Sequence, residues 1–234
     1  MQERRSVNES GIAQFFGRVY GVMGIGMVVT AIVTFILGYV VRDQYVMFLQ
    51  SNQFAYWIML FLPLVFVLFG SSAKSIQNPA RALTMFLLLS ASEGTTLSVI
   101  MTFYSGTTAV AALLVTAVIF GTMALVGVYG KKDLSRAGGI ATMVLFGAIL
   151  MSAVNMFLGA AGMAMIINYV ILGVFIVLVA YDNQRLRQYY SYAEAQGDVA
   201  INALAIQGAM MLYLDFLNLF IVILQIFGVG DSDN

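Results

Sequence analysis

Seven long apolar runs, separated by shorter polar segments, dominate the pattern of hydrophobic and polar positions along the chain. By residue number the runs are 19–41, 54–73, 82–104, 108–129, 137–158, 163–181 and 203–227. An α-helix needs about 20 apolar residues to cross the hydrocarbon core of a bilayer. The pattern therefore predicts an all-α membrane protein with one seven-helix transmembrane domain over residues 19–228. Residues 1–18 are then an N-terminal segment and residues 229–234 a short C-terminal tail.

The composition agrees with a chain that lies in lipid. Of the 234 residues, 61% are apolar and only 9% are charged, and the mean hydropathy is +0.93. A soluble domain carries about 25% charged residues, because water must wet its surface. Much of this surface must therefore face the lipid bilayer, which is the first partner that the sequence implies.

The residue types that are missing exclude several kinds of chemistry. The sequence contains no Cys and no His, which excludes disulfides and thiolate catalysis and removes the commonest zinc ligands. The formal net charge is zero, so nothing indicates a nucleic-acid partner. We expect no bound cofactor.

The distribution of Lys and Arg predicts the orientation in the membrane. If the N-terminus is cytoplasmic, Arg42 alone of the 11 Lys and Arg residues lies outside, which leaves ten inside. Those ten are Arg4, Arg5, Arg18, Lys74, Arg81, Lys131, Lys132, Arg136, Arg185 and Arg187. Cytoplasmic segments of membrane proteins carry an excess of Lys and Arg. We therefore expect a cytoplasmic N-terminus and an external C-terminus, which requires an odd number of spans.

Two acidic residues lie inside predicted spans. Asp215 is near the middle of the run 203–227, and Glu93 is near the middle of the run 82–104. An ionised side chain at the bilayer centre costs roughly 2.5–3.5 kcal/mol on insertion scales. Each acid must therefore be protonated, hydrogen-bonded within the bundle, or exposed to water or a cation. Both are candidates for an ion pathway, and the alternative is a network that only holds helices together.

Helical spacing indicates which way Asp215 faces. One stripe of the seventh run, in steps of three and four, consists of Gln207, Met211, Asp215, Asn218, Val222 and Gln225. Because most of these side chains are polar in an otherwise apolar helix, we expect the stripe to face the bundle interior. Glu93 has Ser90 and Thr96 three residues to either side, and Asn155 is a further polar position in the fifth run.

Asp182 directly follows the run 163–181 and precedes more polar residues. Taken alone, it is an ordinary residue of the membrane interface. If the helix continues past Asp182 toward Tyr189, its carboxyl group would lie a turn inside the helix and could meet the seventh span.

Four short segments carry a resemblance to a known family. They are Met-Leu-Tyr-Leu-Asp-Phe-Leu-Asn-Leu-Phe at 211–220, Ala-Tyr-Asp-Asn-Gln at 180–184, Lys-Lys-Asp-Leu-Ser at 131–135 and Gly-Thr-Thr-Leu-Ser at 94–98. Together these segments resemble the Bax inhibitor-1 (lifeguard) family, and they look closest to its bacterial members. The first segment is the most specific, and the matches stand in the family's order over residues 82–228.

The resemblance implies a seven-helix fold with a central C-terminal helix, in the bacterial inner membrane. It also implies a pH-sensitive calcium leak, with calcium as the transported ion and with Asp182 and Asp215 as a hydrogen-bonded pair. In the family, a basic residue near the cytoplasmic end of the second helix acts as a latch on this pair. Lys74 and Arg81 are the candidates for that latch in this sequence.

Elementary electrostatics supports such a sensor. Two carboxyl groups in contact at low dielectric cannot both ionise, so they share a proton and titrate in two coupled steps. Calcium prefers several oxygen ligands, and Asp215, Glu93 and Asn218 could supply some of them. With so few acids, we expect a weak, conducting calcium site at Asp215 and Glu93 rather than a storage site.

Two other functions stay open. A non-transporting regulator that binds other membrane proteins would fit the same sequence. An intramembrane aspartyl protease fits less well, because Tyr213-Leu214 precedes Asp215 where that class has Gly-x-Gly. We therefore expect no enzymatic activity and assign no catalytic residue.

The orientation generates a direct prediction. A reporter fused after Asn234 should report the external side, and the same reporter fused after Lys132 should report the cytoplasm. Alkaline phosphatase, active only outside, and a fluorescent protein, active only inside, measure the two sides. Fluorescence from both fusions would contradict the odd number of spans.

Overall fold

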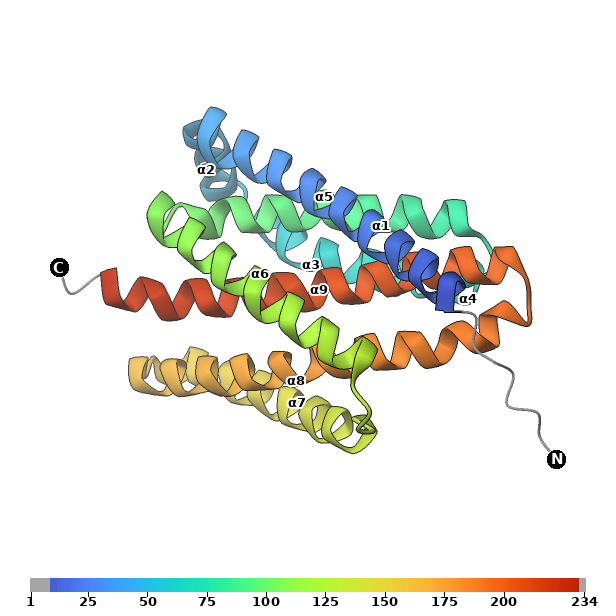
Figure 1. Ribbon diagram of the computed structural model, residues 1–234. Coiled ribbons are helices and arrows are strands. Elements are labelled where there is room, and N and C mark those ends of the chain that lie inside the picture. The colour runs from blue at the N-terminus through green and yellow to red at the C-terminus, as the bar shows by residue number, and fades with distance from the viewer. Residues whose placement is uncertain (1–8, 232–234) are drawn as a thin grey trace. The chain divides into compact units, whose positions relative to one another are not determined.

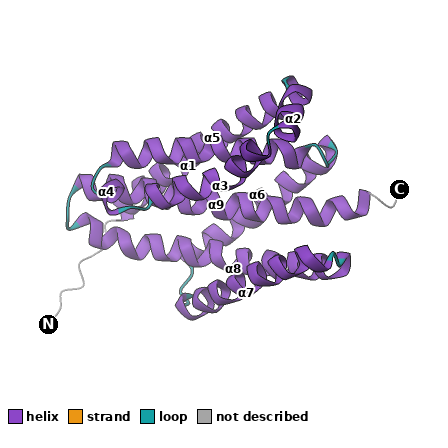
Figure 2. Ribbon diagram, turned by 180° about the vertical axis from the view of Figure 1, so that it is seen from behind, coloured by secondary structure: helices purple, strands orange, loops and turns teal. Residues whose placement is uncertain are grey.

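The computed structural model describes residues 9–231, and these residues fold into helices joined by short turns (Figure 1). In chain order the helices are α1 (Glu9–Phe35), the π-helical turn η1 (Ile36–Val40), α2 (Arg42–Ser51), α3 (Gln53–Gly70), α4 (Ala73–Ile76), α5 (Pro79–Met101), α6 (Gly106–Tyr129), α7 (Ser135–Leu158), α8 (Ala161–Glu194) and α9 (Asp198–Asp231). Within this range no strand is present, and Figure 2 shows only purple helices and teal loops there. Arg4, Arg5 and the end of the C-terminal tail lie outside the described residues.

The prediction of an all-α protein with seven transmembrane helices is confirmed. Among the described residues, seven helices are long and apolar enough to cross a membrane. They are α1 with η1, α3, α5, α6, α7, α8 and α9. In its most apolar window, α9 buries 61% of the residues inside the protein, whereas α7 buries 11% and so presents most of its surface to lipid. A central position for α9 remains a prediction.

Two polar segments that the hydropathy pattern places outside the spans are helical. The connection between the first two runs contains α2, and α8 continues beyond Tyr181 as far as Glu194. The residues that extend α8 include Gln, Arg, Leu, Ala and Glu, which are strong helix formers. The end of an apolar run therefore does not mark the end of the helix, because backbone hydrogen bonds continue through the polar residues that follow. Gly197, with φ +94°, then makes the turn into α9.

The structure divides into two compact units. The first comprises Met1–Phe103 and Arg187–Tyr213, and the second comprises Tyr104–Leu186 and Leu214–Asn234. Helices α8 and α9 therefore each contribute one segment to each unit.

In the first unit, α1 packs closely against α5. A Cβ atom at Gly94 would lie 2.9 Å from the carbonyl oxygen of Thr30, so only glycine fits at this crossing. The Thr30 hydroxyl donates to the carbonyl oxygen of Ser90 at 2.9 Å, and the Thr34 hydroxyl donates to that of Gly94 at 3.2 Å. Close backbone approach and interhelical hydrogen bonds are the forces that join helices in lipid.

In the second unit, glycines bring α8 against α6 and α7. A Cβ atom at Gly127 of α6 would overlap the carbonyl oxygen of Ala180, and one at Gly138 of α7 would overlap the ring of Tyr181. Both contacts fall on the motif at 180–184, so the second unit holds this part of α8 from two sides.

These contacts predict different effects for two substitutions in α6. Gly127→Ala should destabilise the protein by roughly 1–3 kcal/mol, because the new methyl group meets backbone atoms that cannot move aside cheaply. Gly121→Ala is the matched control, because no atom lies within 4 Å of its added Cβ. Thermal unfolding in detergent measures both variants. Equal melting temperatures for Gly127→Ala and Gly121→Ala would contradict the close approach of α6 and α8.

Candidate functional site: a pair of buried aspartates

Asp182 lies within α8 rather than at its end, because the helix continues to Glu194. Its side chain is only 7% exposed. The continuation of α8 resolves the alternatives that the sequence left open, since a residue that ends an apolar run is here an internal, buried position. The site therefore begins with a carboxyl group that the surrounding helices remove from solvent.

Gln184, two residues after Asp182, anchors this part of α8 to the connection between α6 and α7. Its Oε1 accepts from the backbone N–H of Leu134 at 2.8 Å, and its Nε2 donates to the carbonyl oxygen of Lys132 at 2.7 Å. One side chain thus satisfies two backbone groups of the connection and fixes the rotation of α8 about its axis.

The connection between α6 and α7 is itself ordered by Asp133. Its Oδ1 accepts from the backbone N–H of Ser135 at 2.9 Å and from the Ser135 hydroxyl at 2.6 Å. These hydrogen bonds, led by that of the hydroxyl, hold the pKa of Asp133 below its ordinary value. The Lys-Lys-Asp-Leu-Ser segment therefore serves as a rigid support for Gln184.

The neighbours of Asp182 in the motif are each held by the protein. Ala180 and Asn183 lie against Gly127, and Tyr181 lies over Gly138. Asn183 is fully buried, and its Nδ2 donates to the carbonyl oxygen of Val179 at 2.8 Å. With these side chains fixed, Asp182 is the member of the motif that reaches α9.

Asp215 supplies the second carboxyl group from the middle of α9. Its side chain is 6% exposed. The next residue, Phe216, packs edge-on against Phe120 of α6, with ring centroids 5.4 Å apart. This aromatic contact sets the rotation of α9 within the second unit and so directs the neighbouring carboxyl group.

The two carboxyl groups are hydrogen-bonded to each other, as the family resemblance implies. Arg185, one turn further along α8, places a positive charge near Asp182. The second oxygen of Asp215, Oδ2, is buried and has no hydrogen-bond partner among the described residues. An unsatisfied buried oxygen costs about 1–3 kcal/mol, so this oxygen is a place where a proton, a water or an ion would be stabilised.

Glu93, the other predicted ion-pathway acid, belongs to the first unit. It is half-buried on α5, and its charge acts on the hydroxyl of Tyr213. That hydroxyl lies 2.6 Å from Oγ1 of Thr30 and is hydrogen-bonded to the Ser90 side chain. Glu93 therefore lies beside a hydrogen-bonded cluster, which we call the Tyr213 cluster: Thr30, Ser90 and Tyr213.

Sequence reasoning missed the Tyr213 cluster. Thr30 and Tyr213 are 183 positions apart, and a threonine or a tyrosine in an apolar run is common enough to pass unnoticed. The signal available in the sequence was Tyr213 itself, in the Leu-Tyr-Leu-Asp segment. It lies about 200° around the helix from Asp215, so its polar hydroxyl needs a partner of its own.

The expectation that the polar stripe of α9 faces the interior is wrong for Asn218. Asp215 and Val222 are buried, but Asn218 is exposed and its Nδ2 donates to the carbonyl oxygen of Leu214 at 2.8 Å. A hydrogen bond to its own helix satisfies the amide without a partner helix. Asn155 likewise has a local role, since its Oδ1 accepts from the N–H of Ala160 beyond the end of α7.

The remaining candidates lie away from the pair in sequence. Lys74 is exposed on α4, and Arg81 is half-buried in the first turn of α5, both in the first unit. A latch by either on the aspartates remains a prediction. The part of the chain that the structure describes holds no cluster of three or more acidic residues that could bind a metal ion. A weak calcium site at Asp215 and Glu93 also remains a prediction.

Comparisons with known proteins agree with the four motifs. A sequence profile described as "Inhibitor of apoptosis-promoting Bax1" matches residues 12–232. An uncharacterized membrane protein of Streptococcus pyogenes serotype M1 is 35% identical over 225 residues, which cover 96% of each chain. The inner membrane protein YbhL of Escherichia coli strain K12 is 34% identical over 220 residues, which cover 94% of this chain and 93% of YbhL.

The profile match extends over the motifs at 94–98, 131–135, 180–184 and 211–220 and over all seven spans. The relatives align along nearly their whole lengths, so the likeness concerns the entire fold rather than one segment. The chain is thus a multi-pass membrane protein that belongs to the Bax inhibitor-1 family.

Proposed function

We propose that the protein is a pH-sensitive calcium leak channel or transporter of the bacterial inner membrane, gated by Asp182 and Asp215. The observation that carries this proposal is the buried, hydrogen-bonded carboxyl pair joining α8 to α9. The location follows from the seven spans and from the name of the relative YbhL, an inner membrane protein.

The gate follows from the chemistry of two acids in contact. With one proton between them, the carboxyl groups attract each other and tie α8 to α9. Without that proton, two negative charges face each other where the dielectric is low and repulsion is strong. Ionisation therefore biases α8 and α9 toward separation. Local electrostatic changes of this kind drive two-state conformational switches.

The unsatisfied Oδ2 of Asp215 supports cation passage at the same place. A buried carboxylate oxygen is stabilised by a proton or by a cation, and calcium binds carboxylate oxygens readily. The paired acids supply negative charge, but the described residues offer no larger acidic cluster to retain the ion. Such a site favours brief occupancy, which suits conduction.

Glu93 is proposed as a second acidic position of the ion pathway. It is the half-buried acid of α5, and the cluster at Tyr213 beside it provides hydroxyl groups rather than a compensating cation. Hydroxyl oxygens are suitable partners for a hydrated cation that moves past a carboxylate.

We expect the pH dependence of calcium flux to vanish when the pair cannot titrate. Asp182→Asn combined with Asp215→Asn should give a flux that is flat over the pH range where wild type varies, because amides hold their hydrogen bond at every pH. Calcium entry into proteoliposomes containing only this protein, followed with a trapped indicator, is the measurement. The sign of the wild-type response is left to experiment, since opening and cation attraction need not share the same pH optimum.

The matched control is Asp43→Asn, which removes an exposed acid of α2 outside the spans and should keep the wild-type pH profile. A double aspartate variant that retained the wild-type profile would place the sensor elsewhere. Absence of flux from wild type itself would reject the channel and favour a regulator that binds other membrane proteins.

A separate prediction concerns Glu93. Glu93→Gln should fold normally and lower calcium flux about tenfold, the change that corresponds to roughly 1.4 kcal/mol of lost attraction for the cation. Glu194→Gln, at the end of α8, is the matched acid-to-amide control and should leave flux unchanged. A Glu93→Gln protein with a changed melting temperature but wild-type flux would show that Glu93 is structural.

A further inference from the structure

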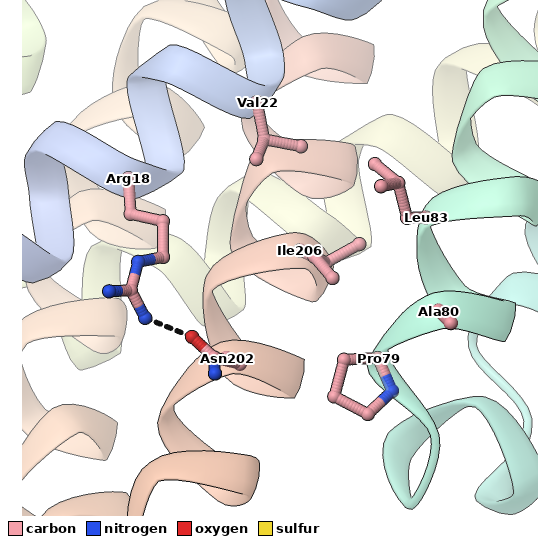
Figure 3. Close-up of a pocket in the computed structure, with 7 residues that line it drawn as sticks. All are labelled: Arg18, Val22, Pro79, Ala80, Leu83, Asn202 and Ile206. Carbon is pink, nitrogen blue, oxygen red and sulfur yellow. Dashed lines mark hydrogen bonds between the residues drawn. The ribbon is translucent and has the colours of Figure 1, made fainter.

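The first unit contains a cavity that the proposed ion pathway does not use. It has a volume of about 240 Å³ and lies where α1, α5 and α9 meet (Figure 3). The residues that line it are Arg18, Val22, Pro79, Ala80, Leu83, Asn202 and Ile206. A single water occupies roughly 30 Å³ in the liquid, so the cavity accommodates a group far larger than one water molecule.

The lining of the cavity is divided between one charged end and an apolar remainder. Arg18 of α1 donates a hydrogen bond to Oδ1 of Asn202 of α9. Figure 3 shows this pair on one side, with Val22, Leu83 and Ile206 pointing into the space beside it. An apolar group with an anionic group at one end would complement both parts of the lining.

The cavity lies at the ends of spans rather than in the middle of the membrane. Pro79 is the first residue of its span, and Asn202 lies in the second turn of the span that begins at Asp198. Arg18 is one of the ten basic residues that the sequence predicts on the cytoplasmic side. Near the cytoplasmic ends of spans, a basic side chain between helices can meet the headgroup of an anionic lipid.

We propose that this cavity binds an anionic phospholipid, with the phosphate on Arg18 and the glycerol and upper acyl chain against Val22, Leu83 and Ile206. A guanidinium has five N–H donors in a planar fork that suits phosphate oxygens. The hydrogen bond to Asn202 uses one of these donors and holds the guanidinium at the cavity. The lipid site is independent of the ion pathway proposed above.

Purified full-length protein in detergent tests the proposal by native mass spectrometry with dioleoyl phosphatidylglycerol and dioleoyl phosphatidylcholine as probes. Wild type should bind phosphatidylglycerol more tightly than phosphatidylcholine. Arg18→Gln should weaken phosphatidylglycerol binding about fivefold, the effect of one basic side chain near a membrane surface. Arg136→Gln, which removes an exposed basic residue outside the cavity, should leave binding unchanged.

A second variant tests the same site without changing Arg18, in case Arg18→Gln fails to fold. Ala80→Phe fills the cavity from an exposed position and leaves Arg18 and Asn202 in place, so it should also weaken phosphatidylglycerol binding. Equal weakening by Arg18→Gln and Arg136→Gln would overturn the proposal in favour of diffuse attraction. Displacement of the lipid by inorganic phosphate, or unchanged binding to Ala80→Phe, would also overturn it.

Discussion

The bilayer offers no water to a buried acid, and this constraint governs the second unit. Asp182 and Asp215 meet it by bonding to each other, which fixes the distance between their helices. The contacts at Gly127 and Gly138 bring α8 close enough to its neighbours, and Gln184 sets its rotation. The packing of α8 therefore brings two carboxyl groups into contact, and two such groups cannot both ionise without strong repulsion.

Helix α9 carries both Asp215 of the aspartate pair and Tyr213 of the Tyr213 cluster. Tyr213 hydrogen-bonds within the first unit, and Asp215 hydrogen-bonds within the second. Among the spans, α9 has the largest share of residues buried inside the protein.

Much of the fold follows from the sequence, because span length and apolar content are local properties. The burial of Asp182 does not, since hydropathy ends at Tyr181 while helix α8 continues; the motif at 180–184 supplied that pairing instead. Asn218 was expected to face the bundle interior but is exposed. Helical spacing shows which residues share a face of α9, but it does not show how much of that face is covered by other helices. Arg18 and Asn202 are 184 positions apart, and no local pattern connects them.

The hydrogen bonds of Gln184 have a mechanical consequence. They tie α8 to the backbone of the connection between α6 and α7 at the same level as Asp182. If the carboxyl groups repel, α8 cannot withdraw without breaking both bonds and the close contact at Gly127. In the proposed gate, repulsion between the carboxyl groups would therefore displace the segment of α9 that carries Asp215 rather than α8.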